Sequence, residues 1–240
     1  MRFPGLPLAL MLIASGARAQ PPAEDEFLPR ETGFSGLRGP TGMAEVGLTW
    51  LVLPGAEVCV ERSAGCEKGD QSFGVEVWQL YRANTRLAFG AGAMLALITT
   101  TDAPRVDPEG VARDHSRGYL TVEGIVRYYP YVERTIEVWV GLVGGLVVVS
   151  DSFDQSDPVT DKALVGPRGT AIRSEGYTVG LATGMAYSLA PHWSLGATLR
   201  YSNWFLPQEP ERDVLGDEAS LTGRNTMFAL SVSVAYRLSL

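Results

Sequence analysis

The chain has 240 residues, with 27 acidic and 20 basic side chains and a formal net charge of −7. An acidic chain without a basic stripe argues against a nucleic-acid partner. The length fits one domain, and no residue pattern indicates a cofactor.

The first 19 residues have the three parts of a secretory signal peptide: a charged start at Arg2, a short apolar run over 6–14, and the cleavage pattern Ala17-Arg18-Ala19. The apolar run is shorter than the ~20 residues of a membrane-spanning helix, so a cleaved signal is favoured over an anchor. Cleavage after Ala19 removes two arginines and changes the formal charge to −9. Residues 20–40, rich in Pro, Gly and charge, are expected to form a flexible periplasmic leader.

The only two cysteines, Cys59 and Cys66, lie in one polar stretch. In an exported protein such a close pair indicates a local disulfide. A metal site is the alternative, but two thiols without a nearby histidine fall short of the four ligands of a zinc site. The disulfide is therefore favoured.

Eight segments alternate apolar with small or polar residues at period two, which is the pattern of β-strands. They are 41–53, 73–83, 86–100, 118–128, 135–150, 175–189, 193–205 and 227–240. The connections alternate in length, and the long ones are 54–72, 101–117, 151–174 and 206–222. An even-numbered meander with alternating loop lengths is typical of a transmembrane β-barrel with its short turns in the periplasm. The sequence predicts an all-β fold over residues 41–240, an eight-stranded antiparallel up-and-down transmembrane β-barrel.

The last segment shows the alternation best. Phe228, Leu230, Val232 and Val234 form one face, with small or polar residues such as Ser231 and Ser233 on the other. We expect the apolar face to contact lipid and this strand to close the barrel against 41–53. A soluble barrel with its apolar face inward is the alternative.

Aromatic residues gather at the ends of the predicted strands, which favours the membrane barrel over the soluble one. They are Tyr128, Tyr129, Tyr131, Trp193, Tyr201, Trp204 and Phe205. Aromatic girdles at the two membrane interfaces give this pattern.

These features resemble the small eight-stranded outer-membrane barrels of Gram-negative bacteria, the OmpA/OmpX-like and opacity-type porin-like group. The segment from Ala190 to Gly196 resembles a periplasmic turn and following strand of such barrels. The closing Tyr236, Leu238 and Leu240 resemble the C-terminal signal that the barrel assembly machinery recognises, although the family most often ends in Phe. The resemblance implies an outer-membrane location in contact with lipid.

Seven charged residues are predicted to face the lumen: Glu45, Glu76, Glu123, Arg127, Glu137, Arg200 and Arg237. An eight-stranded barrel is just wide enough for side chains, so these charges must pair. Arg127 and Glu137 flank a short turn and are expected to lie close together near the periplasmic end. A plug of ion pairs is favoured over a gate for solutes.

An enzymatic role has one candidate, because some outer-membrane barrels are lipid hydrolases that use Ser and His. His115 lies in a long connection beside Asp114 and Ser116, and His192 lies in a predicted periplasmic turn. Adjacency in sequence does not supply the geometry of a catalytic triad, so a non-enzymatic, solvated loop is favoured. The acidic connection with Asp151, Asp154, Asp157 and Asp161 lacks the order of a calcium loop, so no metal is expected.

The sequence therefore favours a monomeric outer-membrane barrel with a structural or cell-surface interaction role, a plugged lumen, and long loops open to a surface ligand. A narrow channel for ions or small solutes and an outer-membrane lipid hydrolase are the alternatives.

Overall fold

A computed structural model describes residues 40–61, 65–102, 113–155, 169–213 and 217–239. The predicted signal peptide and most of the predicted leader lie outside the described residues. No helix in these ranges is long and apolar enough to cross a membrane.

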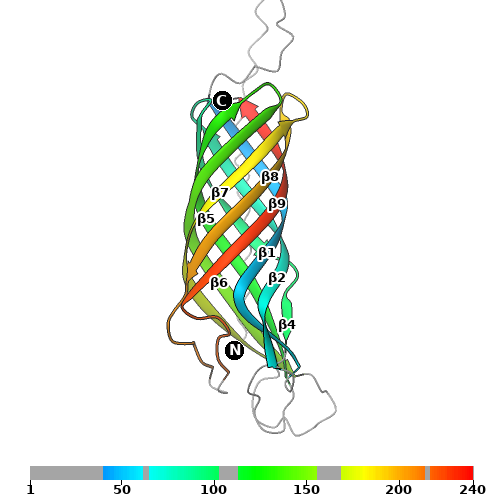
Figure 1. The fold of residues 1–240 in the computed structure, drawn as a ribbon, viewed down its shortest axis with the longest axis vertical. Helices are drawn as coiled ribbons and strands as arrows, with labels where there is room; N and C mark the ends of the chain where they lie inside the picture. The colour runs from blue at the N-terminus through cyan, green and yellow to red at the C-terminus, as the bar shows by residue number, and fades with distance from the viewer. Residues whose placement is uncertain (1–39, 62–64, 103–112, 156–168, 214–216, 240) are drawn as a thin grey trace, which may run out of the picture. The chain divides into compact units, whose positions relative to one another are not determined.

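The described residues form one closed antiparallel β-barrel (Figure 1). Its strands are β1 (Thr41–Glu61), β2 (Gly65–Arg82), β3 (Leu87–Ala96), β4 (Thr100–Asp102), β5 (Arg113–Val132), β6 (Ile136–Gln155), β7 (Gly169–Ser188), β8 (Trp193–Phe205) and β9 (Arg224–Ser239). Neighbours in the chain pair with each other, and β5 pairs with both β3 and β4, so β4 continues the path of β3 along the ring. The predicted fold class, a ring of eight antiparallel strands, is confirmed.

The barrel closes between its first and last strands, as the final strand predicts. β1 pairs with β9 from Thr41 opposite Ser239 to Val52 opposite Phe228. The three short turns, at 83–86, 133–135 and 189–192, lie at the same end as the start of β1 and the end of β9 (Figure 1). We call this the turn end and the opposite end the loop end.

The strands extend further toward the loop end than the sequence predicts. Residues 54–61, 65–72, 113–117, 151–155 and 169–174, expected to be loop, are strand residues. Their outward positions are mostly polar, so the hydrophobic alternation ends while the backbone pairing continues. Strands of about 20 residues are twice as long as the 9–11 residues that cross a membrane.

The predicted strand 86–100 is interrupted before its end. The carbonyl oxygen of Phe73 accepts hydrogen bonds from the backbone N–H groups of both Leu97 and Ile98, at 2.8 and 3.1 Å. Two residues therefore oppose one, as in a β-bulge, and regular pairing resumes at β4.

The outward face carries an apolar band, which we call the belt. Residues such as Val46, Leu142, Leu181 and Val232 are about half or more exposed. So large a continuous apolar surface is covered by lipid rather than water.

Outward aromatic residues border the belt at both ends. At the loop-end border the cross-strand pairs are Trp50 with Phe73, Tyr177 with Phe205, and Tyr201 with Phe228. At the turn-end border they are Tyr81 with Phe89 and Trp193 with Tyr236. Tyr128, Tyr131, Trp193, Tyr201 and Phe205 are exposed, as expected for girdle residues. Tyr129 and Trp204 are instead buried in the lumen, because side chains of adjacent strand residues point to opposite faces.

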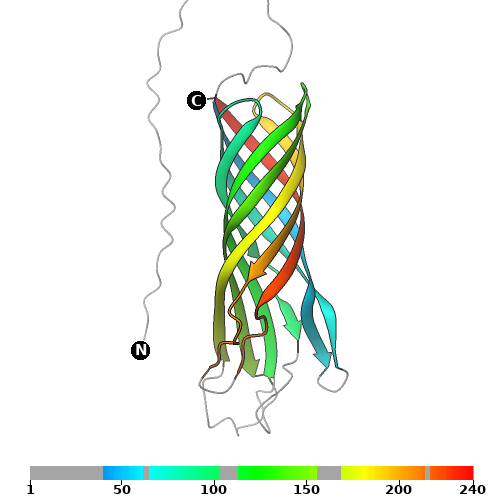
Figure 2. The same cartoon turned by 60° about the vertical axis from the view of Figure 1, so that its left-hand side comes forward.

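Beyond the belt, β1 and β2 continue as a two-stranded arm (Figure 2). β1 leaves β9 after Val52, and β2 pairs with β3 only from Gly74 onward, so residues 53–61 of β1 and 65–70 of β2 pair with each other. The Cys59–Cys66 disulfide joins the two sides of this arm, as predicted. An isolated pair of strands is only marginally stable in water, so a covalent link near its tip stabilises it.

Candidate functional site

The lumen holds all seven charged residues that the sequence places there, and each is buried in an ion pair. They come from six different strands, so their pairing ties distant parts of the ring together. Near the turn end, Glu137 binds two arginines, with 2.7 Å from Arg82 Nη1 to its Oε1 and 2.7 Å from Arg237 Nη2 to its Oε2. Arg82 was not among the predicted residues, although its parity on the strand points it inward.

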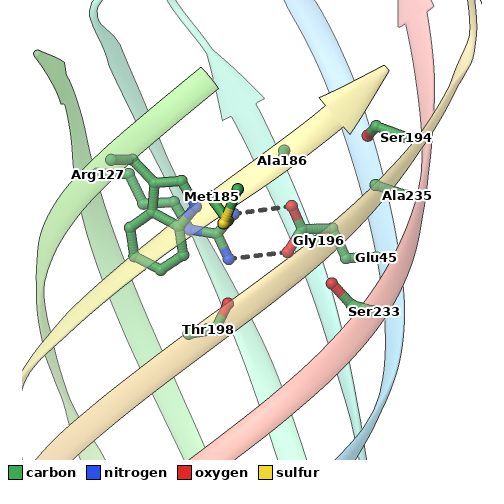
Figure 3. A pocket seen from close by; sticks show the side chains of 10 residues that line it. Glu45, Arg127, Met185, Ala186, Ser194, Gly196, Thr198, Ser233 and Ala235 are labelled. Carbon is green, nitrogen blue, oxygen red and sulfur yellow. Dashed lines mark hydrogen bonds and ion pairs between the residues drawn. The ribbon is translucent and has the colours of Figure 1, made fainter. Parts of the chain in front are cut away.

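Arg127 forms a bidentate pair with Glu45 across the lumen (Figure 3). The two N–O distances are 2.7 and 2.8 Å, and the guanidinium lies 4.0 Å from the centroid of the Trp139 ring. Arg127 and Glu137, which were expected to lie close together, have different ion-pair partners. The register places Arg127 opposite Gly141, four residues from Glu137, and a β-bulge between Tyr128 and Tyr131 intervenes.

A second network, the middle network, lies in the membrane-spanning part of the barrel. Arg200 binds Glu123 through Nη1 and Glu76 through Nη2, the latter at 3.2 Å. Thr178 donates its hydroxyl hydrogen to the other oxygen of Glu123 at 3.2 Å. All three charged groups are almost fully buried, so the network depends on its own contacts for charge compensation.

Apolar side chains fill the space between these networks. One cluster includes Trp78, Tyr129 and Trp139, and a second, toward the loop end, includes Tyr119, Trp204 and Met227. Glycines make room for the large rings: a Cβ atom at Gly92 would lie 2.4 Å from Trp78, and one at Gly184 would lie 2.6 Å from Trp139. The small residues of the lumen face thus allow a packed interior.

A cavity of about 10 Å³ beside the Arg127–Glu45 pair is bordered by small and hydroxyl residues, including Ser194, Thr198 and Ser233 (Figure 3). A cavity needs roughly 10–15 Å³ to hold one water molecule. This space is therefore on the scale of a single water and far below that of a solute path.

At the loop end, five charged or titratable side chains form the outer cluster: Asp70, Asp102, His115, Arg117 and Asp151. They come from β2, β4, β5 and β6 and are all buried. Arg117 Nη1 lies 2.9 Å from Asp70, which also accepts hydrogen bonds from Tyr119 and Thr100. The cluster joins the arm to the barrel, because Asp102 accepts the Cys59 N–H at 3.2 Å.

His115 lies at the centre of the outer cluster and is 4% exposed. Its Nδ1 contacts Asp102 Oδ1, its Nε2 lies 2.6 Å from Asp151 Oδ1, and its ring stacks on Phe153 with centroids 4.6 Å apart. Outward neighbours at this level, Asp114 and Ser116, are polar, so the cluster lies beyond the belt.

Two pKa values in the outer cluster are shifted in opposite directions. Burial alone would lower the pKa of His115, but the hydrogen bonds and charges of Asp102 and Asp151 outweigh it and raise that pKa. Burial alone would raise the pKa of Asp151, but hydrogen bonds from His115 and Ser220 lower it. Both shifts favour the charged forms.

The connection between β8 and β9 packs into the loop end of the barrel. We call its described residues, 206–213 and 217–223, the mouth segment. Leu206, Ala219 and Leu221 are buried in the apolar clusters of the barrel. Ser220 donates both its backbone N–H, at 3.1 Å, and its hydroxyl hydrogen to Asp151, and its Oγ accepts from Arg117 Nε at 2.7 Å.

The outer cluster corrects two expectations for the loops. His115 and Asp151, placed by the sequence in solvated connections, are buried strand residues. Both ring nitrogens of His115 are occupied by carboxylates, so the ring has no free nitrogen to act as a general base. Asp157 and Asp161 lie outside the described residues, and no group of three or more potential ligands within the described ranges has metal-binding geometry.

The residues of the predicted assembly signal lie at the turn end of β9. Tyr236 packs against Trp193 with ring centroids 4.9 Å apart, and Leu238 is exposed on the outward face. Leu240 lies outside the described residues. In the turn between β7 and β8, His192 Nδ1 lies 2.9 Å from the carbonyl oxygen of Arg237.

No protein-family model matches the sequence, and no curated protein sequence is similar to it at a significant level. Solved structures match its fold. A major outer membrane protein from Thermus thermophilus has a TM-score of 0.50 and 16% identity, over 81% of this chain and 99% of the other. Neisserial surface protein A (NspA) has a TM-score of 0.47 and 14% identity, over 82% of this chain and 96% of the other. The outer membrane protease OmpT from Escherichia coli has a TM-score of 0.40 and 10% identity, over 85% of this chain and 98% of the other. The chain thus has the fold of small outer-membrane β-barrels, which does not by itself assign an activity.

Proposed function

We propose that the chain is a monomeric outer-membrane barrel whose lumen is closed to solutes and which acts as a structural or surface-interaction protein through its loop end. The packed lumen is the observation that supports this role most directly. Arginine–glutamate networks alternate with apolar clusters along the barrel, and the mouth segment adds buried side chains at the loop end. A strand number of eight leaves no wider passage.

Single-channel recording in planar bilayers tests the closed lumen. Purified, refolded full-length protein is expected to give no steady conductance, because buried ion pairs and apolar clusters fill the lumen. A porin of known conductance, added to the same bilayers, controls for detection. Steady, reproducible channels from the wild-type protein would replace this proposal with the narrow solute channel.

A hydrolase role receives no support from the geometry. A serine–histidine mechanism needs an imidazole nitrogen that can accept a proton from the nucleophile. Asp102 and Asp151 occupy both nitrogens of His115, and the other histidine, His192, lies in a turn at the opposite end of the barrel. The expectation of a non-enzymatic protein is therefore kept in the proposal.

The proposal includes export and assembly. A signal peptide ending at Ala19 would deliver the chain to the periplasm, and residues 20–40 would remain there as a leader. Tyr236, Leu238 and Leu240 would be read by the barrel assembly machinery, with the turn end facing the periplasm. Leu238 is 53% exposed on the outward face, so a partner can reach it from outside the barrel.

Replacing Leu238 with serine tests the assembly signal. The variant is expected to accumulate several-fold less in the outer-membrane fraction, because it loses an apolar contact outside the barrel and no lumen packing. A matched replacement of Leu189, which is also exposed near the turn end, controls for the loss of a surface leucine. Equal accumulation of both variants and wild type would remove Leu238 from the signal.

A further inference from the structure

His115 has hydrogen-bonding needs that only one of its protonation states meets. Its Nδ1 and Nε2 both contact carboxylate oxygens, of Asp102 and Asp151. A neutral imidazole carries one N–H, so it can donate to only one of these carboxylates and turns a lone pair toward the other. The imidazolium ion has two N–H donors and satisfies both. The arrangement is therefore complementary to protonated His115.

The charges around His115 lead to the same conclusion. Asp70 from β2, Asp102 from β4 and Asp151 from β6 supply three carboxylates, and Arg117 on β5 supplies one guanidinium. With His115 protonated the cluster carries a net charge of about −1, and with His115 neutral about −2, both counted at ordinary ionisation states. Uncharged groups complete the hydrogen bonds of the cluster: the Tyr119 hydroxyl, whose pKa is raised well above its usual value by burial, the hydroxyls of Thr100 and Ser220, and the Glu57 carbonyl oxygen, which accepts from Arg117. The neighbouring carboxylates Asp114 on β5 and Asp154 on β6 are exposed.

Asp151 connects this protonation to the mouth segment. Its Oδ1 accepts hydrogen bonds from His115 and from the Ser220 hydroxyl, and its Oδ2 accepts from the Ser220 backbone N–H. Around this point Leu221 and Ala219 are inserted into the apolar clusters, and the Thr170 hydroxyl donates to Asp217 at 3.0 Å. Ser220 is therefore a buried polar attachment of the mouth segment to β5 and β6, beside the contact of Asp217 with β7.

We propose that His115 is a proton-dependent latch: when protonated it holds the Asp102–Asp151 pair together and fixes the mouth segment at the loop end, and when it loses its proton the segment is released. The latch goes beyond the closed lumen proposed above. The middle network lies deeper in the barrel and contains no histidine, so the lumen stays closed whether or not the mouth segment is attached.

The direction of the pH effect follows from the two shifted pKa values. The raised pKa of His115 means that its contribution is fully present at low pH and is lost as pH rises through that pKa. The lowered pKa of Asp151 means that its contribution is present at neutral pH and is lost as pH falls through that pKa. The mouth segment is therefore held at pH values between the pKa of Asp151 and the pKa of His115. Above the pKa of His115 it is released, because His115 loses its proton.

Hydrogen exchange at the Ser220 amide reads the latch directly, because this N–H donates to Asp151. The measurement uses refolded full-length protein in lipid nanodiscs, with exchange rates corrected for the intrinsic effect of pH. Once pH exceeds the His115 pKa, protection at Ser220 is expected to fall by up to about tenfold per pH unit, since one proton is linked to the opening. Protection within the barrel, for example at Leu230, is expected to stay constant.

Two variants and a control test whether His115 causes the loss of protection at Ser220. Asp102→Asn is expected to abolish the alkaline loss of protection, because neutral His115 then donates to Asp151 and accepts from the introduced amide. His115→Gln is expected to lower protection at Ser220 at every pH and to remove its pH dependence. His192→Gln, at the opposite end, should behave as wild type.

Three results would overturn the latch, and each is decisive without the others. The first is a wild-type protein in which the corrected protection of the Ser220 amide does not fall as pH rises. The second is a His115→Gln variant in which that protection still falls as pH rises. The third is an Asp102→Asn variant in which it falls at the same pH as in the wild type. The last two variants are independent, so the failure of one to fold leaves the other as a test.

Discussion

Replacing Arg200 with methionine is expected to destabilise the barrel by about 3–5 kcal/mol, the cost of breaking a buried ion pair by removing one partner. The guanidinium contacts both Glu76 and Glu123, and all three groups are nearly inaccessible to water. Without it, two carboxylates remain in the lumen with no cation between them. The midpoint of unfolding in guanidinium chloride, followed by tryptophan fluorescence of the refolded protein, measures the loss.

Matched variants separate burial from charge. Arg212 forms an exposed ion pair with Glu218 at 2.7 Å, so Arg212→Met is expected to change stability by less than about 1 kcal/mol. Adding Glu76→Gln and Glu123→Gln to Arg200→Met should recover much of the lost stability, because it removes the uncompensated charges. An Arg200→Met protein as stable as the Arg212→Met protein would show that water reaches the middle network and that the lumen is not closed there.

The outline of the barrel was predictable because its physical cause is local. In β9, successive residues face lipid and lumen in turn. The apolar or small character of each side chain from Phe228 to Val234 therefore indicates which of the two it faces. A strand that faces lipid on one side and packed side chains on the other leaves little freedom in composition. The same alternation assigns Glu45, Glu123 and Arg200 to the inward face, and all three are buried in the structure.

The partners of those charges were not predictable, because they depend on three-dimensional register. Arg127 and Glu137 are close in sequence across a short turn, yet the bulge at Tyr128 and the stagger of the strands give them different partners. Arg82 is separated from Glu137 by 55 residues and joins it across the lumen. Only closure of the ring brings such residues together.

The outer cluster was missed for a different reason. Beyond the belt the outward residues are polar. The alternation of apolar and polar residues that indicates a strand is therefore absent there. One signal does persist: on β5 the inward residues have odd numbers, and His115, Arg117 and Tyr119 continue the parity of Glu123 and Arg127. Extending that parity past the apolar region would have predicted an inward histidine and arginine.

Val232→Arg tests the central physical claim, that lipid covers the outward face. Val232 lies on β9 midway between two girdle residues, Phe228 and Tyr236, and its side chain is 54% exposed. An arginine at the midplane of a membrane barrel costs about 2–4 kcal/mol. In a water-soluble barrel the same exposed position would accept arginine with a change of about 0.5 kcal/mol or less. The two environments therefore give different results for one substitution.

Ala171→Arg is the matched control, because Ala171 is also exposed and outward but lies six residues beyond the girdle residue Tyr177. Unfolding midpoints in lipid bilayers are expected to fall for Val232→Arg and to stay near wild type for Ala171→Arg. Equal midpoints for the two variants would mean that water reaches the belt, and the membrane assignment would then fail. A loss confined to Val232→Arg would place the belt in the bilayer and the outer cluster, on the far side of Tyr177, in the aqueous phase where His115 can exchange its proton with the medium.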